Sequence, residues 1–227
     1  MDELWTSHVG TVPYREAVEL QERLRERVVA RELGDLLLEL EHPPVYTLGR
    51  RSGAQDLPLP EAAYRERGID VVQTDRGGKL TYHGPGQLVG YPIMHVDDVI
   101  AFLRTMERAI IAALGEAGIE ARSREAEGRD YTGVWVQDRK IASIGVHLSR
   151  GVSTHGFAVN VDNDLAPFGQ VVACGLPDVQ MTSIRAEGGT DSLDCFRKRM
   201  GHAFATAFGR RQRLVAAARL ASIPSLA

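Results

Sequence analysis

The sequence predicts an α+β fold, and two observations carry this prediction. Three segments place apolar residues at helical spacing, and extended runs that meet at short turns lie between them. These helices and strands do not follow the regular strand–helix–strand rhythm of a doubly wound parallel sheet, which favours antiparallel neighbours. With 227 residues, no internal repeat and no clear linker, residues 1–227 are predicted to form a single domain.

The first part of the chain predicts one helix followed by strands. The helix covers residues 13–33, because apolar residues recur on one stripe at Ala17, Leu20, Leu24 and Val28. The apolar runs 34–42 and 68–74 predict strands. Pro43 and Pro44 cannot continue a central ladder, so the stretch 42–53 predicts a loop interrupted by a short strand.

Two further helices are predicted in the second half of the chain. Asp97 or Asp98 can cap a helix that runs to about Gly118, with apolar residues on one stripe at Ile100, Leu103, Met106, Ile110 and Leu114. The last helix starts at about Ser192 and turns these residues inward: Leu193, Phe196, Met200, Ala203, Phe204 and Ala207.

Between these two helices the sequence predicts strands joined by tight turns. Residues 131–137 and 140–148 form a predicted hairpin with Asp138-Arg139 as its two-residue turn. Residues 155–162 follow as another strand. Helices and antiparallel strands thus interleave along the whole chain.

Composition excludes several classes of protein. The chain is 44% hydrophobic and 25% charged, as ordinary globular proteins are, and its net charge of −3 argues against binding nucleic acid mainly through phosphate contacts. Neither a run of about 20 apolar residues nor a signal-like start is present, so we expect a cytoplasmic protein with no membrane partner. Two cysteines are too few for a disulfide scaffold.

The stretch DRGGKLTYHGPGQLVGYPI, residues 75–93, is rich in glycine but does not fit a nucleotide loop. In a phosphate-binding loop Gly78-Lys79 would be followed by Ser or Thr, and here Leu80 follows. In a dinucleotide fingerprint the third glycine would stand where Val89 is. Two interpretations stay open: glycines that let the backbone lie against a long apolar ligand, or a tight hairpin around a Gly-Pro-Gly turn.

The histidines do not predict a metal site. His147 and His155 flank a turn and could face each other, but the sequence offers no third ligand at metal spacing. His83 follows an extended run, where a structural histidine and a polar group at the mouth of a site are both plausible. No metal and no cofactor are therefore expected.

Cys174 and Lys140 are the candidate reactive pair. Cys174 lies in VVACGLP, a segment without helical period, where a thiol followed by glycine is accessible for attack, whereas Cys195 belongs to a predicted helix. A free thiol has a pKa of about 8.5 and needs a base to be nucleophilic at neutral pH. Only Lys79, Lys140 and Lys198 are lysine among 27 basic residues, and lysine, unlike arginine, can give up its proton.

These motifs resemble, in the same order, those of the bacterial lipoyl(octanoyl) transferase family. The resemblance covers nearly the whole chain, from about residue 5 to about residue 210. It is carried by PVYTLGRR, RGGKLTYHGPGQLVGYPI, RKIASIGVHL, THGFAVNV and ACGLPDVQMTSI. One difference is Ala173, where the family usually has proline before its cysteine.

The resemblance implies a fold and an activity. The fold would be that of the biotin and lipoate ligases, a central mixed, largely antiparallel sheet flanked by helices beside an acyl tunnel. The activity would be transfer of an octanoyl group from octanoyl-acyl carrier protein to a lysine. The acceptors would be lipoyl domains of 2-oxoacid dehydrogenase E2 subunits and the glycine cleavage H protein.

The resemblance also implies site residues. Cys174 matches the cysteine that carries the acyl thioester, and Lys140 matches the lysine that activates it. The acyl-contact segments match Arg76, Gly77, Gly78, Lys79, Leu80, Thr81, Tyr82 and His83, then Ser143, Ile144 and Gly145, and then Gly156, Phe157 and Ala158.

Two other functions stay open on the sequence. An ATP-dependent lipoate or biotin ligase of the same fold would need a nucleotide site and no essential cysteine. A non-enzymatic module that binds lipoyl domains or acyl carriers would keep the tunnel without requiring Cys174 or Lys140. For acidic partners, the candidate steering residues are Arg50, Arg51, Arg76, Arg122, Arg124 and Arg129.

Overall fold

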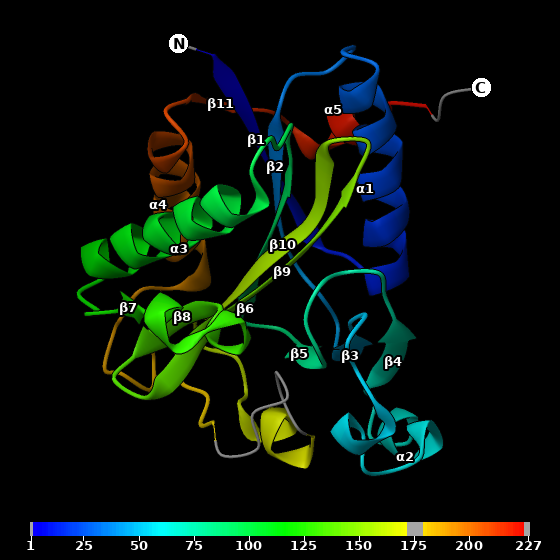
Figure 1. Cartoon of the computed structure of the whole chain (residues 1–227), viewed down its shortest axis with the longest axis vertical. Coiled ribbons are helices and arrows are strands. Elements are labelled where there is room, and N and C mark those ends of the chain that lie inside the picture. Colours follow the sequence, from blue (N-terminus) through cyan, green and yellow to red (C-terminus); the bar gives the residue numbers. More distant parts are fainter. Residues whose placement is uncertain (1, 172–178, 225–227) are drawn as a thin grey trace.

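A computed structural model describes residues 2–171 and 179–224. In this part of the chain eight strands form one sheet in the order β11-β1-β2-β6-β10-β9-β8-β7 (Figure 1). Their bounds are β1 Glu3–Thr11, β2 Leu36–Glu41, β6 Gln87–Ile93, β7 Arg122–Ser123, β8 Gly133–Val136, β9 Arg139–Ser149, β10 Val152–Asn160 and β11 Arg211–Leu214. Strands β11, β1 and β2 are parallel, and the other neighbours are antiparallel. The predicted α+β fold with a mixed, largely antiparallel sheet is confirmed.

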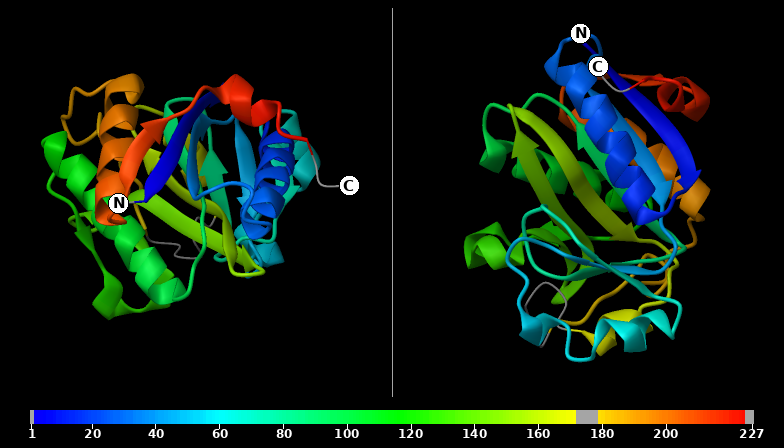
Figure 2. Two further views of the ribbon diagram at one scale, coloured as in Figure 1. Left: turned by 90° about the horizontal axis from the view of Figure 1, so that it is seen from above. Right: turned by 90° about the vertical axis from the view of Figure 1, so that its right-hand side faces the viewer.

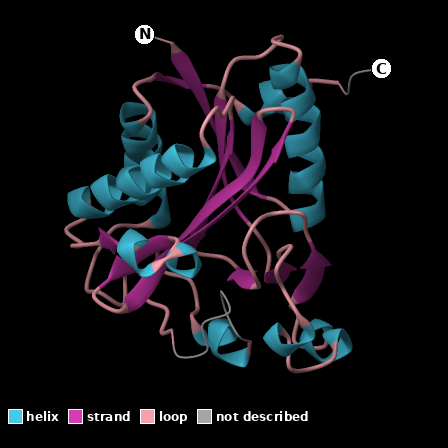
Figure 3. Cartoon of the chain, viewed as in Figure 1, coloured by secondary structure: helices cyan, strands magenta, loops and turns pink. Residues whose placement is uncertain are grey.

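A second, smaller sheet lies at one end of the large one (Figure 3). It consists of β3 (Val45–Leu48), β4 (Asp70–Gln73) and β5 (Thr81–His83), with β3 in the middle. The helices are α1 Tyr14–Val29, α2 Glu61–Arg65, α3 Val99–Glu116, α4 Leu193–Ala207 and α5 Ala217–Ala221. None of the helices in the described ranges has the length and apolar character needed to cross a membrane.

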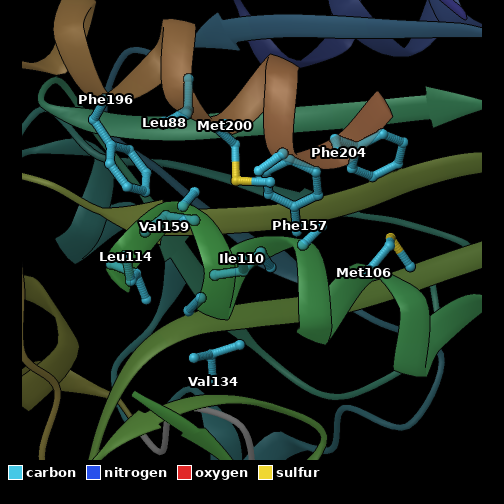
Figure 4. Packing of buried hydrophobic residues seen from close by; sticks show 14 of the residues in the cluster. Leu88, Met106, Ile110, Leu114, Val134, Phe157, Val159, Phe196, Met200 and Phe204 are labelled. Atoms are coloured by element: carbon cyan, nitrogen blue, oxygen red, sulfur yellow. The ribbon is translucent and has the colours of Figure 1, made fainter. Parts of the chain in front are cut away.

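The large sheet lies between two layers of helix. Seen from above, α3 and α4 cover one face and α1 covers the other (Figure 2). On the first face, α3 and α4 pack against each other and against Phe157 and Val159 of β10 (Figure 4). Each such side chain contributes about 1.5–3 kcal/mol by leaving water. Because both faces are covered, β2 has leucines on both, with Leu37 toward α3 and α4 and Leu38 toward α1.

The starts of α3 and α4 agree with the predicted helix starts. Asp98 Oδ1 accepts hydrogen bonds from the amides of Ile100 (2.8 Å) and Ala101 (3.0 Å), and Ser192 caps α4 in the same way. Helix α1, in contrast, ends at Val29, four residues before the predicted end. Arg31 has the left-handed backbone (φ 57°) that commonly follows a helix terminus, so the chain turns there toward β2.

Some helices, strands and turns of the structure differ from those predicted from the sequence. Strands β1, β7 and β11 and helices α2 and α5 were not predicted from the sequence. The predicted Asp138-Arg139 turn is wrong, because Val136 pairs with Arg139, so Gln137-Asp138 forms the turn. Gln137 takes the positive φ of 52° that such a two-residue turn requires.

The hairpin interpretation of the glycine-rich stretch is also wrong. Strand β5 pairs with β3 in the small sheet, whereas β6 pairs with β2 and β10 in the large sheet. The Gly84-Pro85-Gly86 turn between them therefore joins two sheets. The stretch that precedes β5 lies against β9, where the amide of Gly77 donates to the carbonyl of Val146 at 2.9 Å.

Glu39 gives a testable prediction about stability. It lies on β2, is 1% exposed, and faces α4, where an Arg197 nitrogen is 3.8 Å from Oε2. Burial raises the pKa of its carboxyl from 4.5 to about 8. The folded protein therefore holds a proton that the unfolded chain releases between these values, and the free energy of unfolding falls as pH rises from 4.5 to 8.

Glu39→Gln is expected to remove this dependence. The variant should gain stability over the parent as pH rises from 5 to 8, by on the order of a few kcal/mol at pH 8. Urea unfolding at several pH values measures this difference. Glu61→Gln on the exposed surface is the control and should follow the parent. A constant difference between Glu39→Gln and the parent across this range would contradict the assigned cause.

Candidate active site

A cavity of about 480 Å³ lies where the glycine-rich stretch and β5 meet β9 and β10 of the large sheet. Helices α1 and α3 each contribute their first residues to its wall. The lining residues are Tyr14, Arg50, Arg51, residues 76–81, His83, Tyr91, Val99, Leu103, Arg129, Asp130, Thr132, Lys140, residues 143–146 and residues 155–158.

Glycines let the two walls approach each other. A Cβ atom at Gly145 would lie 2.7 Å from the carbonyl oxygen of Gly77, closer than real side chains come. This contact is to backbone, which cannot rotate away. Any other residue at position 145 would therefore push the two walls apart, as expected for glycine used for close backbone approach.

The structure brings almost all predicted site residues to this cavity. Lys140 and the predicted binding residues line it, with Tyr82 as the exception among the residues the structure describes. Tyr82 points to the other face of β5, because side chains alternate along a strand. Its ring packs 5.5 Å from that of Tyr46 and 5.4 Å from that of Phe168, so its predicted ligand contact is replaced by a role in the small core. Cys174 lies outside the described residues.

Arg76 ties the glycine-rich wall to the small sheet. It is buried, and its guanidinium donates to the carbonyl oxygen of Thr47 at 2.5 Å and to the hydroxyl of Thr47 at 2.8 Å. It also donates to the carbonyl of Gly77 at 3.1 Å. These bonds fix the backbone of the wall at the point where it faces the cavity.

Five rings form a buried cluster at one end of the cavity: Tyr14, His42, His83, Tyr91 and His155. The hydroxyl of Tyr14 lies 3.3 Å from His155 Nδ1, and that of Tyr91 lies 2.7 Å from His42 Nε2. Burial lowers the pKa of His42 to about 4 and that of His83 well below its ordinary value. These imidazoles are therefore neutral at physiological pH and offer uncharged faces.

The ring cluster and Lys140 lie toward opposite ends of the site. His155 pairs with Val146 on β9, six residues after Lys140. At about 3.3 Å per residue, six residues of strand span about 20 Å. Ser143 and Gly145 lie on β9 between these ends and face the same cavity. The cavity is therefore elongated, with a backbone-lined middle.

The two histidines considered as metal ligands contact one carboxylate instead. Asp75 places Oδ1 2.7 Å from His155 Nε2 and Oδ2 3.4 Å from His147 Nε2. The hydrogen bond from His155 lowers the pKa of Asp75 to about 2. Each carboxylate oxygen thus faces one imidazole, and across residues 2–171 and 179–224 no group of three or more such side chains is arranged to hold a metal ion.

Lys140 is fixed by a contact of its side chain and by hydrogen bonds of its backbone. It is 2% exposed, and its Nζ lies 5.3 Å from the centre of the Trp135 ring on β8. Its backbone pairs with the segment that follows residue 178, because its amide donates to the carbonyl of Gln180 at 2.8 Å and its carbonyl accepts from Thr182 at 2.9 Å. Lys140 is the second residue of β9, one position further into the strand than predicted.

Cations dominate the charged lining of the cavity. Arg50, Arg51 and Arg129 are exposed there, and Lys79 is partly exposed; Asp130, 2.6 Å from Arg51, is a nearby acid. The other two predicted steering residues do not line the cavity. Arg122 contacts Asp138 at 3.4 Å, and Arg124 pairs with Glu127.

Sequence reasoning missed several lining residues. Tyr14 and Tyr91 lie in elements that were predicted, but nothing in their local pattern distinguishes a cavity wall from a core. Leu103 lies on the predicted apolar stripe of α3, which sequence alone assigns to the core, and Val99 is the first residue of that helix. Their positions follow from packing between distant segments.

Comparison with known proteins gives consistent results. Residues 13–205 match the family described as the lipoyl protein ligase A/B catalytic domain. The chain is 47% identical to an octanoyltransferase of Solibacter usitatus over 206 residues, which cover 88% of this chain and 90% of the relative. It is 47% identical to an octanoyltransferase of Dictyoglomus thermophilum, covering 78% of this chain and 74% of that protein.

Solved structures show the same fold. A lipoate-protein ligase A crystallised with ATP superimposes with a TM-score of 0.78, covering 97% of this chain and 93% of that one. The two sequences are 18% identical, so this likeness concerns the fold alone.

Proposed function

The chain belongs to the lipoyl protein ligase A/B catalytic domain family, and from this membership we propose how it works. It is a transferase that moves octanoyl groups in protein lipoylation. The donor is octanoyl-acyl carrier protein, and Cys174 carries the acyl group as a thioester. The acceptors are lysines of lipoyl domains, in 2-oxoacid dehydrogenase E2 subunits and in the glycine cleavage H protein.

In the first half-reaction Lys140 takes the proton of the Cys174 thiol. The thiolate attacks the carbonyl carbon of the octanoyl thioester, and the bond from that carbon to the carrier's sulfur breaks. The departing thiolate takes a proton from Lys140, which returns to its neutral form. One thioester replaces another, so this half needs no energy from ATP.

In the second half-reaction the ε-amine of the acceptor lysine attacks the acyl-enzyme. An amide bond forms, the bond to the Cys174 sulfur breaks, and Lys140 accepts the proton that the amine loses. The thiolate that is released then receives this proton. Backbone N–H groups near Cys174 or Ser143 would stabilise the oxyanion in both halves.

The elongated cavity is the single observation that carries the proposal. It has a lysine toward one end, a backbone-lined middle and a cluster of tyrosine and histidine rings toward the other end. An eight-carbon chain can lie along such a path with its thioester near Lys140. The predicted contacts at residues 76–81, His83, residues 143–145 and residues 156–158 are proposed to line the acyl chain.

The chain connectivity supports a Cys174–Lys140 pair. The carbonyl of Gln180 accepts a hydrogen bond from the backbone amide of Lys140, and Gln180 lies six residues after Cys174. Six residues of fully extended chain reach about 20 Å, so the short sequence distance from Gln180 is compatible with the proposed pairing of Cys174 with Lys140. The separation of 34 positions in sequence is therefore no obstacle to their meeting.

The cations at the cavity suit acidic partner proteins. Arg50, Arg51, Lys79 and Arg129 give the cavity an excess of positive charge beside the path to Lys140. Such an excess speeds the encounter with an acidic protein and is screened by salt. The cytoplasmic location and the single catalytic domain predicted from the sequence stay predictions.

Transfer without ATP tests the proposal against its two rivals. The protein, octanoyl-acyl carrier protein and a lipoyl domain are mixed without nucleotide, and the lipoyl domain is weighed by mass spectrometry. We expect the domain to gain one octanoyl group. Transfer that requires ATP and free octanoate would support a ligase, and binding of the domain without transfer under either condition would support a non-enzymatic module.

A further inference from the structure

Helix α3 carries a buried carboxylate, Glu107, that is bonded to a neighbour of Lys140. Glu107 is 1% exposed, and each of its oxygens accepts hydrogen bonds. Oε1 accepts from the amide of Gly133 at 2.9 Å. Oε2 accepts from the hydroxyl of Ser123 at 2.7 Å and from the guanidinium of Arg104 at 2.7 Å. A carboxylate buried at this depth is stabilised by such charge-assisted bonds.

Gly133, the residue that Glu107 holds, touches the side chain of Lys140. Gly133 opens β8 with a φ of +137°, a backbone conformation that favours glycine. A Cβ atom there would lie 2.7 Å from Cε of Lys140, 3.3 Å from its Nζ, and 2.5 Å from the carbonyl oxygen of Ala142. The bare Cα of Gly133 is thus a packing surface for the end of the lysine side chain.

Helix α3 and Lys140 are therefore connected through one peptide unit. The amide of Gly133 can meet Glu107 only while the backbone of Gly133 keeps this conformation, and that conformation leaves room for Lys140. Removal of the carboxylate would leave a buried N–H group without its acceptor, which is unfavourable and promotes rotation of the peptide. Rotation would move the surface on which Cε and Nζ rest.

We propose that Glu107 is a positioning residue for Lys140, which acts by holding the Gly133 peptide against the lysine side chain. This inference rests on the proposed role of Lys140 in the octanoyl transfer. Displacement of a reacting group by about 1 Å can cost about a hundredfold in rate, so a fixed Nζ matters to turnover. Glu107 itself touches neither substrate nor the reacting atoms.

The test reads the amine of Lys140 directly. The chain has only three lysines, so acetic anhydride labelling followed by peptide mass spectrometry resolves Lys140, with the 66% exposed Lys198 as internal standard. In Glu107→Ala we expect the labelling of Lys140 relative to Lys198 to rise at least about threefold, and kcat to fall about tenfold or more with little change in KM for the carrier. Glu107→Gln, which keeps an acceptor for Gly133, should restore both values toward the parent.

Two further variants separate positioning from general damage. Ser123→Ala removes a hydrogen bond to the same carboxylate but leaves the Gly133 contact, so its Lys140 labelling should match the parent. Gly133→Ala inserts the colliding methyl group and should reproduce the Glu107→Ala labelling even where Glu107→Ala does not fold. Unchanged Lys140 labelling in folded Glu107→Ala or Gly133→Ala protein, or equal changes in Ser123→Ala, overturns the inference.

The labelling also distinguishes this inference from the proposed function. It needs no substrate and reports only the surroundings of Nζ. Altered labelling with unaltered turnover would contradict the role of Lys140 in catalysis while leaving its link to Glu107 in place. Unaltered Lys140 labelling in folded Glu107→Ala, together with loss of turnover in Lys140→Arg, would contradict the link to Glu107. It would leave the role of Lys140 in catalysis in place.

Discussion

Replacing Cys174 by serine is expected to abolish acylation of the protein. With octanoyl-acyl carrier protein and no acceptor, the parent should gain the mass of one octanoyl group, and Cys174→Ser should gain none within the same time. Serine has a hydroxyl whose proton is far harder to remove than that of a thiol, and the thiolate is the nucleophile in thioester exchange. We expect turnover to fall by roughly 10³-fold or more, as for other nucleophile replacements.

Cys195 supplies the matched control for this experiment. It is an exposed free thiol on α4 and is not among the residues that line the cavity. Cys195→Ser should therefore acquire the octanoyl group at the parent's rate. Acyl transfer that persists in Cys174→Ser, or an adduct that disappears only in Cys195→Ser, would refute the thioester assigned to Cys174.

Lys140→Arg is expected to lower kcat by roughly 10²–10⁴-fold, the usual contribution of a general acid–base group. Arginine keeps the positive charge, but it does not release its proton near neutral pH. The variant should therefore fail in both half-reactions. Single-turnover mass spectrometry measures the first as formation of the acyl-enzyme and the second as its discharge onto a lipoyl domain.

Lys198→Arg is the control for Lys140→Arg. Lys198 lies on the exposed face of α4, 2.7 Å from Asp194, so its replacement should leave both half-reactions unchanged. Thermal unfolding of Lys140→Arg must show that the variant is folded. A folded Lys140→Arg variant with near-parental turnover would mean that another group moves the proton.

Local signals were enough to predict the fold class and two helix starts. Asp98 and Ser192 are side chains whose capping bonds depend only on the next two or three residues, so sequence reveals them. Strands β1 and β11, in contrast, pair with each other although they lie at opposite ends of the chain. Glu3 pairs with Arg211 across 208 positions, and buried polar residues such as Thr6 break the apolar alternation that marks a strand.

The candidate site likewise combines residues that the sequence reveals with contacts that only the fold creates. The family motifs point to the residues that line the cavity, yet only the strand geometry separates His83, which faces the cavity, from Tyr82, which does not. The meeting of Asp75 with His147 and His155 depends on how the glycine-rich stretch crosses β9. Likewise, the Glu107–Gly133 contact joins a helix to a strand 26 residues later, which no spacing rule foresees.

The two walls of the cavity belong to different sheets. The width of the cavity and the position of Lys140 are therefore set by different parts of the fold. Lys140 is fixed in the large sheet, whereas the glycine-rich wall is anchored by Arg76 to Thr47 of the small sheet, which has its own core around Tyr46 and Tyr82. Substitutions in that core could tilt the wall and change the width of the cavity without disturbing the lysine. A lineage of such proteins could in this way change the size of the acyl group it accepts while inheriting its chemistry intact.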